Sequence, residues 1–169
     1  DTAEMAFRAA MTGHQVFTTL HTNSALGVFP RLMDIGIQPG ILAGNIIGVI
    51  AQRLVRKLCP RCKEAYTPDE HEARILGVEA AAAPTIYRPV GCPACSHKGY
   101  RGRLALIELL RMDPDLDELV ANHAPLHDIR RAALAHGYRP LAEDGVQRVL
   151  DGVTSLSEVA RVVDLTGRV

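Results

Sequence analysis

The sequence predicts an α/β fold that ends in a set of short helices. The spacing of apolar residues near the start is typical of an amphipathic helix, and a β-branched and aromatic run at residues 15–20 predicts a buried strand after it. The last third instead alternates helix starts with glycine stops. A chain of 169 residues with 47% hydrophobic residues can bury a core, which excludes a disordered tail and a disulfide-stapled peptide.

The first third of the chain predicts further helices after that strand. Asn23 or Ser24 can cap a helix that begins at Ala25, and Pro30 is expected to kink or shorten it. A long helix is predicted next, at residues 41–58, because its apolar residues share one face and its last turn is cationic. Helix, strand and helix in this order indicate the α/β class.

Helix starts with strong local signals mark the rest of the chain. Residues 67–70 offer a threonine cap, a proline in the first helical position and a glutamate three residues after the cap. Similar starts lie at Asp113 and at residues 155–158. Short helices at residues 126–135 and 146–150 each end before a glycine, which is typical of a helix C-terminus.

The charge of the chain points to no partner for the molecule as a whole. The charges of nineteen basic and nineteen acidic residues cancel. The net charge of the whole chain therefore favours binding neither to nucleic-acid phosphates nor to anionic membranes. The balance is uneven, however, at −1 for residues 1–50, +5 for residues 51–111 and −4 for residues 112–169. This asymmetry fits either docking between segments or subunits, or two solvated faces.

Location is indicated by the cysteines and by the lengths of the apolar runs. Four cysteines without a signal peptide indicate a reducing compartment, and we expect a cytoplasmic protein. The most apolar stretch, residues 41–51, is about half of the roughly 20 residues that a bilayer span needs, so no transmembrane segment is expected. The chain opens without an initiator methionine inside a helical pattern, so we expect it to be part of a longer protein.

The cysteines form the most specific motif of the sequence. Two C-x-x-C pairs, Cys59 with Cys62 and Cys92 with Cys95, are separated by 29 residues. Two such pairs supply the four thiolates that a tetrahedral structural zinc requires. All four ligand positions would then be filled by protein, so the Zn²⁺ would activate no water. It would instead stabilise the fold by linking the two ends of the loop between the cysteine pairs.

Two other interpretations of the cysteines stay open. A C-P-x-C sequence also resembles the dithiol of thiol-disulfide oxidoreductases, and the four thiols can also be free. A redox motif normally opens a helix after a strand, whereas here the first pair is expected to end a helix and the motif is duplicated. Zinc is therefore favoured.

A second candidate site follows the predicted strand, at residues 18–23. In open parallel sheets, ligands lie beyond the carboxyl ends of strands, so His21 and the neighbouring hydroxyls can touch a phosphate or an attacking water. A histidine at a strand end is about as often structural. The phosphate loop, G-x-S-x-G and H-E-x-x-H motifs are all absent from the sequence. The chain can thus be the second part of a nucleotide-hydrolysing domain whose first part lies upstream.

A series of short motifs runs through nearly the whole chain. The motifs of the first part are Asp1-Thr2-Ala3, Ala6, Thr12-Gly13-His14, Thr19-Leu20-His21-Thr22-Asn23, Arg31-Leu32, Asp34, Gly36, Ala51-Gln52-Arg53-Leu54-Val55-Arg56 and Leu58-Cys59. Those of the second part are Gly91-Cys92, Cys95, Gly99-Tyr100-Arg101-Gly102-Arg103, Glu108-Leu109-Leu110, Asp144-Gly145, Gly152-Val153-Thr154, Glu158-Val159 and Arg161. With these motifs the chain resembles the secretion ATPases of type II secretion and type IV pilus assembly.

The resemblance implies a motor protein. In that family a RecA-like motor domain forms a hexamer on the cytoplasmic side of the inner membrane and uses ATP hydrolysis to assemble pseudopilins or pilins. This chain would be the C-terminal part, because the phosphate loop and the acidic Walker B motif would lie before Asp1, which stands where the family has the glutamate of Glu-Thr-Ala. The chain alone is therefore expected to be inactive.

The resemblance also implies roles for single residues. The family's histidine box maps onto residues 19–23, with His21 and Thr19 in catalysis, His21 as the sensor of the γ-phosphate or the organiser of the attacking water. Thr22, Asn23 and Arg53 would contact the nucleotide, ATP with Mg²⁺. The four cysteines match the family's tetracysteine zinc element.

The resemblance further implies three segments and two kinds of partner. Residues 1–58 would complete the RecA-like core, residues 59–111 would form the zinc element, and residues 112–169 a C-terminal helical domain. The partners would be identical subunits of a homo-hexamer and the inner-membrane platform protein, which the basic surface near Arg101 and Arg103 is expected to contact. The chain would then be peripheral at the inner membrane, and the choice between secretion and pilus stays open.

Two other classes of function are consistent with parts of the sequence. A zinc-ribbon nucleic-acid module would explain the basic middle third, but the basic residues are scattered and only 4% of residues are aromatic, so no nucleic-acid partner is expected. A zinc-stapled structural or interaction domain without a nucleotide role is the stronger alternative, because hydrolysis needs a phosphate loop that this chain lacks.

Overall fold

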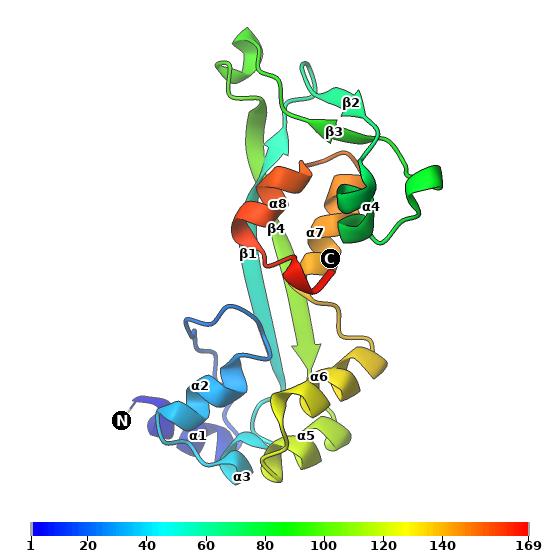
Figure 1. Ribbon diagram of the computed structural model, residues 1–169. Helices are drawn as coiled ribbons and strands as arrows, with labels where there is room; N and C mark the ends of the chain where they lie inside the picture. The colour runs from blue at the N-terminus through cyan, green and yellow to red at the C-terminus, as the bar shows by residue number, and fades with distance from the viewer. Residues whose placement is uncertain (1, 169) are drawn as a thin grey trace. The chain divides into compact units, whose positions relative to one another are not determined.

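Two compact units make up the protein, as a computed structural model that describes residues 2–168 presents it (Figure 1). Asp1, expected to follow a Walker B motif, lies outside the described residues. Each unit is built from two separate stretches of the chain. Unit 1 comprises Asp1–Ala51 with Glu108–Arg139, and unit 2 comprises Gln52–Ile107 with Pro140–Val169.

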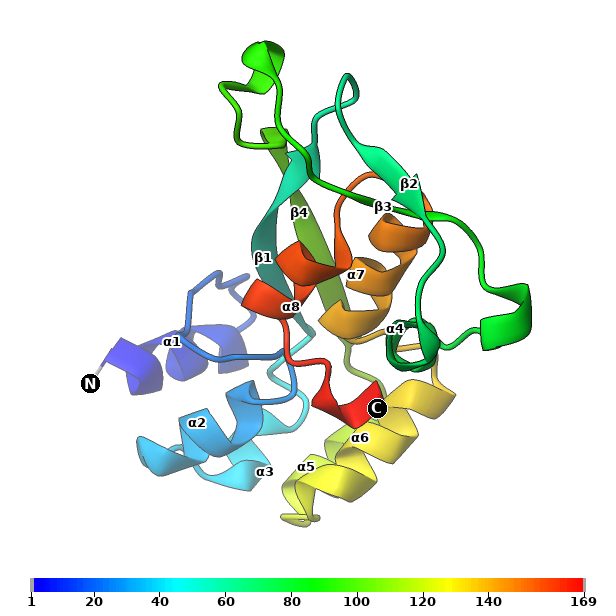
Figure 2. The ribbon, with the colours of Figure 1, turned by 45° about the horizontal axis from the view of Figure 1, so that its top comes forward.

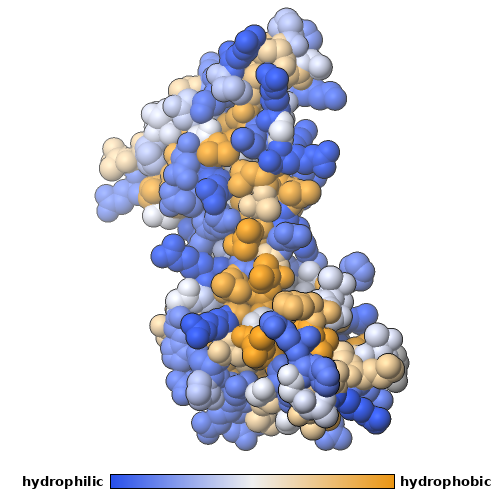
Figure 3. All heavy atoms as spheres, turned by 180° about the vertical axis from the view of Figure 1, so that it is seen from behind, coloured by the Kyte–Doolittle hydropathy of each residue, from blue (hydrophilic) through white to orange (hydrophobic). Residues whose placement is uncertain are grey.

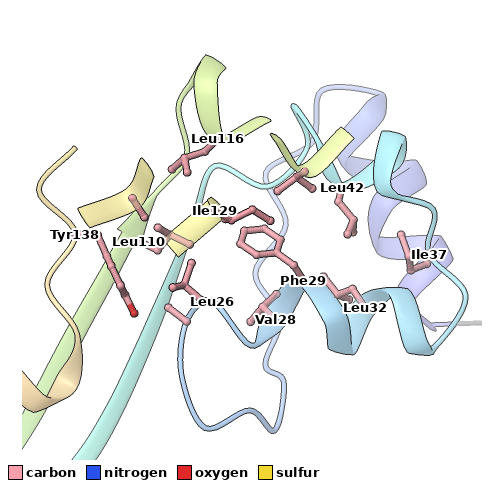
Figure 4. Close-up of a cluster of buried hydrophobic side chains, with 13 residues drawn as sticks. Leu26, Val28, Phe29, Leu32, Ile37, Leu42, Leu110, Leu116, Ile129 and Tyr138 are labelled. Atoms are coloured by element: carbon pink, nitrogen blue, oxygen red, sulfur yellow. The ribbon is translucent and has the colours of Figure 1, made fainter. Parts of the chain in front are cut away.

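Unit 1 is helical and packs around one apolar core. Its helices are α1 (Thr2–Met11), α2 (Val28–Asp34), α3 (Pro39–Leu42), α5 (Pro114–Ala121) and α6 (Leu126–Ala135). Phe29 of α2 is 1% exposed and lies among Leu42 of α3, Leu116 of α5 and Ile129 of α6 (Figure 4). Burial of these side chains is the main force that holds the helices of unit 1 together.

Two long strands run through both units. β1 (Gly48–Leu58) and β4 (Tyr100–Arg111) pair as a two-stranded sheet, and the boundary between the units falls within each strand. Burial alternates along β4, where Leu106 and Leu110 are buried and Ile107 and Leu109 are exposed. This period of two is that of a strand with one covered face.

The helix predicted at residues 41–58 is wrong. The structure has the short helix α3, which ends at Leu42, and then the strand β1 from Gly48 onward. An apolar run rich in isoleucine and valine fits a buried helix or a strand about equally, and only the presence of a partner strand decides between them. Here β4 supplies that partner from residues about 50 positions later in the chain.

The strand predicted at residues 15–20 is also wrong for the structure described. These residues have no regular secondary structure and are mostly exposed, with Phe17 86% exposed. A strand needs a neighbour for its backbone hydrogen bonds, and no strand of residues 2–168 pairs with this segment. The α1 helix before it agrees with the prediction.

Unit 2 combines a short two-stranded sheet with three helices among its described residues. β2 (Glu64–Tyr66) pairs antiparallel with β3 (Ile86–Arg88), and Ala65 lies opposite Tyr87. The two strands lie side by side in Figure 2. The helices are α4 (Glu70–Leu76), α7 (Leu141–Leu150) and α8 (Leu156–Val162), with 3-10 turns η1 (Ala80–Ala82), η2 (Pro93–Cys95) and η3 (Thr166–Arg168).

Side-chain caps explain where several helices begin. The predicted starts at Asp113 and Ser155 are confirmed, because each side chain accepts a hydrogen bond from the backbone three residues later. In α4 the cap is Asp69 rather than the predicted Thr67, and Asp69 and Glu72 form a reciprocal capping box. Both Thr67 and Asp69 have a glutamate three residues later, so the sequence pattern alone does not separate the two candidate caps.

Two other predicted helix boundaries shift by a few residues. The second helix begins at Val28 rather than Ala25, so Pro30 falls in its first turn, where a missing backbone donor costs no intrahelical bond. The helix at residues 126–135 is confirmed as α6, whereas α7 already begins at Leu141, before the predicted residue 146.

Some large apolar side chains remain at the surface of both units. In unit 1 they include Ile47 at 73% and Ile50 at 69% exposure. Hydrophobic residues are visible at the surface in the view from behind (Figure 3). Within residues 2–168, no helix has the length and apolar character that crossing a membrane requires.

Candidate functional site

Two turns of unit 2 bring the four cysteines together. Cys59 follows the last residue of β1, and Cys62 lies in the turn after it, whose backbone closes through bonds from the Cys62 and Lys63 amides to the Cys59 carbonyl at 3.3 and 3.0 Å. Cys92 caps the η2 turn and Cys95 is its last residue, a few residues before β4 begins at Tyr100. Each pair is thus presented by a tight turn, as the C-x-x-C spacing predicts.

The sulfur positions fit a tetrahedral metal ion. All four Sγ atoms lie within 4.8 Å of one another. The Sγ–Sγ distances are 4.0 Å for Cys59 and Cys92, 3.8 Å for Cys62 and Cys95, and 3.9 Å for Cys92 and Cys95. A tetrahedron with Zn–S bonds of about 2.3 Å places its sulfurs about 3.8 Å apart. The donor set and its spacing therefore match those of a structural zinc site.

Backbone amides aimed at the sulfurs favour thiolates. The amides of Cys92 and Gly99 each donate to the Cys95 Sγ at 3.2 Å, and the Gly91 amide donates to the Cys62 Sγ at 3.3 Å. Against the effect of burial, the two amide bonds lower the pKa of Cys95 to about 6. Burial, and after it the hydrogen bonds with the neighbouring thiols, raise the pKa of Cys62 to about 11, although the Gly91 amide acts in the opposite direction.

Two glycines with positive φ shape this cluster. Gly91 has φ of +114°, and a Cβ there would lie 2.7 Å from the His97 carbonyl oxygen. Gly99 has φ of +74°, and a Cβ there would lie 2.5 Å from the Pro89 Cβ. Only glycine allows these amides to approach the sulfurs with this backbone. A glycine just before the second pair and another four residues after it were the available signal.

The two cysteine turns are anchored to the helical part of unit 2. The Lys63 ammonium donates to the Gly152 carbonyl at 2.8 Å and lies 4.1 Å from the centroid of the Tyr87 ring. The Cys59 amide donates to the Gly99 carbonyl at 2.9 Å, which joins the two turns. These contacts tie the ends of the loop between the cysteine pairs to the end of α7.

The surroundings of the first cysteine pair differ from those of a redox dithiol. The first cysteine pair follows the strand β1, not a helix as expected. It is nevertheless followed by the strand β2, whereas a redox pair opens a helix. All four cysteines are free thiols here, and they form one cluster rather than two separate pairs. The grouping favours a shared metal ion over two disulfides.

The second candidate site contains residues 19–23, the histidine segment, which lies between α1 and α2. Thr19, His21 and Asn23 are exposed, and Thr22 is half-buried. The Thr22 hydroxyl donates to the Ser24 carbonyl at 3.0 Å, so the segment turns directly into the buried start of α2. The exposed side chains of Thr19, His21 and Asn23 are thereby accessible to a ligand.

Arg53, the remaining predicted site residue, belongs to unit 2. It lies on β1, and its guanidinium donates to the backbone carbonyl of Gln52 at 3.0 Å. The structure therefore brings the four cysteines into one cluster. The role of Arg53 at the nucleotide stays a prediction.

Comparison with known proteins finds one family along nearly the whole chain. The family described as "Type II/IV secretion system protein" matches residues 1–161. The chain is 48% identical over 162 residues to "Type II secretion system protein E" of Pseudomonas aeruginosa, covering 96% of this chain and 32% of that protein. It is 46% identical over 168 residues to "Type IV pilus assembly ATPase TfpB" of Acinetobacter baylyi, covering 98% of this chain and 29% of that protein. The chain thus spans about a third of the length of these relatives.

A solved structure supports the fold. The structure described as "Crystal Structure of the Pilus Retraction Motor PilT and Bound ADP" matches with a TM-score of 0.65 at 20% sequence identity. The match covers 99% of this chain and 38% of that chain. The chain therefore shares the α/β fold of part of that structure.

Proposed function

The chain belongs to the family of type II/IV secretion system proteins, and on this basis we propose that it is the C-terminal part of a hexameric ATPase that powers pseudopilin or pilin assembly. The observation that carries the proposal is its identity to relatives of both kinds over nearly its whole length. The choice between type II secretion and type IV pili stays open, because relatives from both systems are similarly close.

In the proposed motor, the histidine segment faces the nucleotide. His21 would sense the γ-phosphate or orient the attacking water, with Thr19 beside it, and the exposure of both side chains supports this role. Thr22, Asn23 and Arg53 would contact the nucleotide. ATP with Mg²⁺ would be held mainly by the phosphate loop upstream, so this chain alone would not hydrolyse ATP.

The cysteine cluster serves the proposed motor as a structural centre. Cys59, Cys62, Cys92 and Cys95 would hold one Zn²⁺, which supplies a cross-link between the two turns and no catalytic chemistry. The amide bonds to the Cys62 and Cys95 sulfurs support binding, since they stabilise the thiolate form that a metal requires.

The proposal places the motor at the cytoplasmic face of the inner membrane. Residues 1–58 would complete the RecA-like core, residues 59–111 would form the zinc element and residues 112–169 the C-terminal helical domain. The exposed cations Arg101 and Arg103 support contact with a platform protein in the membrane. Charge reversal at both positions should weaken capture of that protein, and unchanged capture would count against the contact.

The proposed hydrolysis is tested with His21→Ala in the full-length protein. Loss of the imidazole should lower kcat by about 10²-fold or more, while hexamer mass and zinc content stay as in the wild type. His14→Ala is the matched control, because His14 is also exposed on the same connecting segment, bonded only locally to the Thr12 hydroxyl at 3.1 Å. The control should keep its activity.

Two results would contradict the proposal in different ways. Unchanged turnover in His21→Ala would remove the catalytic role of the segment. Absence of any ATPase activity in the full-length wild type would favour a zinc-stapled interaction domain without a nucleotide role.

A further inference from the structure

A buried carboxylate accepts a hydrogen bond from the backbone just after the histidine segment. Glu108 is 2% exposed and points to the covered face of β4, between the buried residues Leu106 and Leu110. Burial of an ionised carboxylate is costly unless hydrogen-bond donors replace its water. The groups that donate hydrogen bonds to Glu108 therefore identify the parts of the chain that its carboxylate fixes.

Two donors from distant parts of unit 1 meet at this carboxylate. The backbone amide of Ala25 donates to Glu108 Oε1, across 83 positions of sequence. The hydroxyl of Tyr138 also hydrogen-bonds Glu108, and burial together with the nearby carboxylate charge raises the Tyr138 pKa. Tyr138 lies beside Leu110 and Leu26 in the core (Figure 4).

Ala25 is the point at which the histidine segment enters the core. Thr19, His21 and Asn23 are exposed, and Ala25 is fully buried two residues after Asn23. The backbone between them is held by two local bonds, from the Thr22 hydroxyl to the Ser24 carbonyl and from the Gly27 amide to the Ser24 hydroxyl at 3.2 Å. The bond from Ala25 to Glu108 adds a long-range anchor on β4.

We propose that Glu108 is a positioning residue that fixes the histidine segment for catalysis through the Ala25 amide. The inference rests on the proposed function, because it concerns the same segment. A charge-assisted bond to a backbone amide is stronger than a neutral one, and it acts on the main chain four residues after His21. Small displacements of a catalytic group lower its rate strongly, so anchoring at this point controls the chemistry without contact with the nucleotide.

The test compares two substitutions of Glu108 in the full-length protein. Glu108→Gln keeps a carbonyl oxygen for the Ala25 amide and a polar group for Tyr138, whereas Glu108→Met has similar length and offers neither. We expect Glu108→Met to lower kcat on the order of 10- to 100-fold with the KM for ATP changed less than about twofold. Glu108→Gln should restore kcat to within about threefold of the wild type.

A double-mutant cycle separates positioning from general destabilisation. If Glu108 acts through His21, then Glu108→Met should lower kcat little further in a His21→Ala background. Equal effects of Glu108→Met in both backgrounds would overturn the inference. A drop caused only by unfolding would reduce the hexameric, zinc-containing fraction instead, with unchanged turnover per folded hexamer, and would also overturn it.

The outcomes also distinguish this inference from the proposed function. If His21→Ala itself leaves kcat unchanged, the proposed function of the segment fails, whereas a loss in His21→Ala with wild-type kcat in Glu108→Met refutes only the positioning role. If Glu108→Met does not fold, Tyr138→Phe is the second variant. It removes only the hydrogen bond between Tyr138 and Glu108 and should destabilise the protein less. It should lower kcat by about two- to fivefold in the wild type and not in His21→Ala, and the same loss in both would refute the role.

Discussion

The cysteine cluster and the histidine segment are held in opposite ways. The cluster is built from two tight turns whose sulfurs lie within 4.8 Å of one another and whose amide donors come from residues near the cysteines. The histidine segment has no regular secondary structure, exposes its polar side chains and reaches a strand 83 positions away through Ala25. This difference fits the roles proposed for them, a structural metal centre built from local contacts and an exposed ligand-binding segment anchored by a distant residue.

The largest expected effect comes from removing the metal. Cys59→Ser, or treatment with a strong chelator, should remove one zinc per chain and destabilise unit 2, because metal binding in small zinc domains contributes on the order of 10 kcal/mol. Elemental mass spectrometry measures the zinc, and hydrogen exchange should show the greatest loss of protection within Gln52–Ile107.

A matched control for the metal prediction lies beside the cluster. Lys98→Ala changes an exposed residue three positions after Cys95 and should keep both zinc and stability. Wild-type protein that is purified without a metal-affinity column and contains little zinc would contradict the structural metal and return the cysteines to the redox or free-thiol interpretations.

An intermediate effect is expected in unit 1, which depends on packing instead. Phe29→Ala should lower the free energy of unfolding by about 3–5 kcal/mol, because it leaves a cavity in the apolar core. Denaturant titration measures the change, and the zinc content should stay at the wild-type value. Phe17→Ala is the control, since Phe17 is 86% exposed and its loss should change stability by less than about 0.5 kcal/mol. Similar losses in the two variants would contradict the assigned core.

The smallest effect concerns an ion pair between α5 and α6. His136 Nδ1 lies 2.6 Å from Asp113 Oδ2, and His136 Nε2 lies 3.5 Å from Asp115 Oδ2. The hydrogen bond to Asp113 raises the pKa of His136 above its ordinary value of 6.5. The Leu116 amide, and after it His136, lower the pKa of Asp113 below 3.8. Both shifts favour the charged pair.

The sign of these shifts gives the pH dependence. A raised histidine pKa adds stability that is complete below pH 6.5 and is lost as the pH rises through the folded-state pKa. A lowered aspartate pKa adds stability above pH 3.8 that is lost as the pH falls through its folded-state value. The melting temperature of the wild type should therefore exceed that of His136→Gln most between these limits, and the difference should shrink towards pH 8. A difference that grows with pH, or an equal loss in the exposed control His71→Gln, would contradict the pair.

Several parts of the fold were predictable because their signals are local. The caps Asp113 and Ser155 need only a side-chain oxygen and the amide three residues later, and the cysteine turns need only their spacing. Helix α1 follows from apolar residues at helical spacing, and α6 from the glycine that follows its end. Such features depend on interactions within about four residues.

The wrong predictions share a cause in long-range pairing. Residues 48–58 became a strand because β4 lies beside them, and residues 15–20 remained irregular because no strand among the described residues pairs with them. A short apolar run carries no information about its partner, so its sequence cannot distinguish a buried helix from a strand.

For the sites, the sequence by itself predicted the four cysteines as metal ligands from their spacing, and the resemblance to a family of motor proteins predicted the roles of the histidine segment. Only the tertiary structure decided that the four sulfurs form one cluster and that Glu108 meets the Ala25 amide. The physical reason is that a contact across 83 positions forms when the core around β4 assembles, and local propensity contains no trace of it.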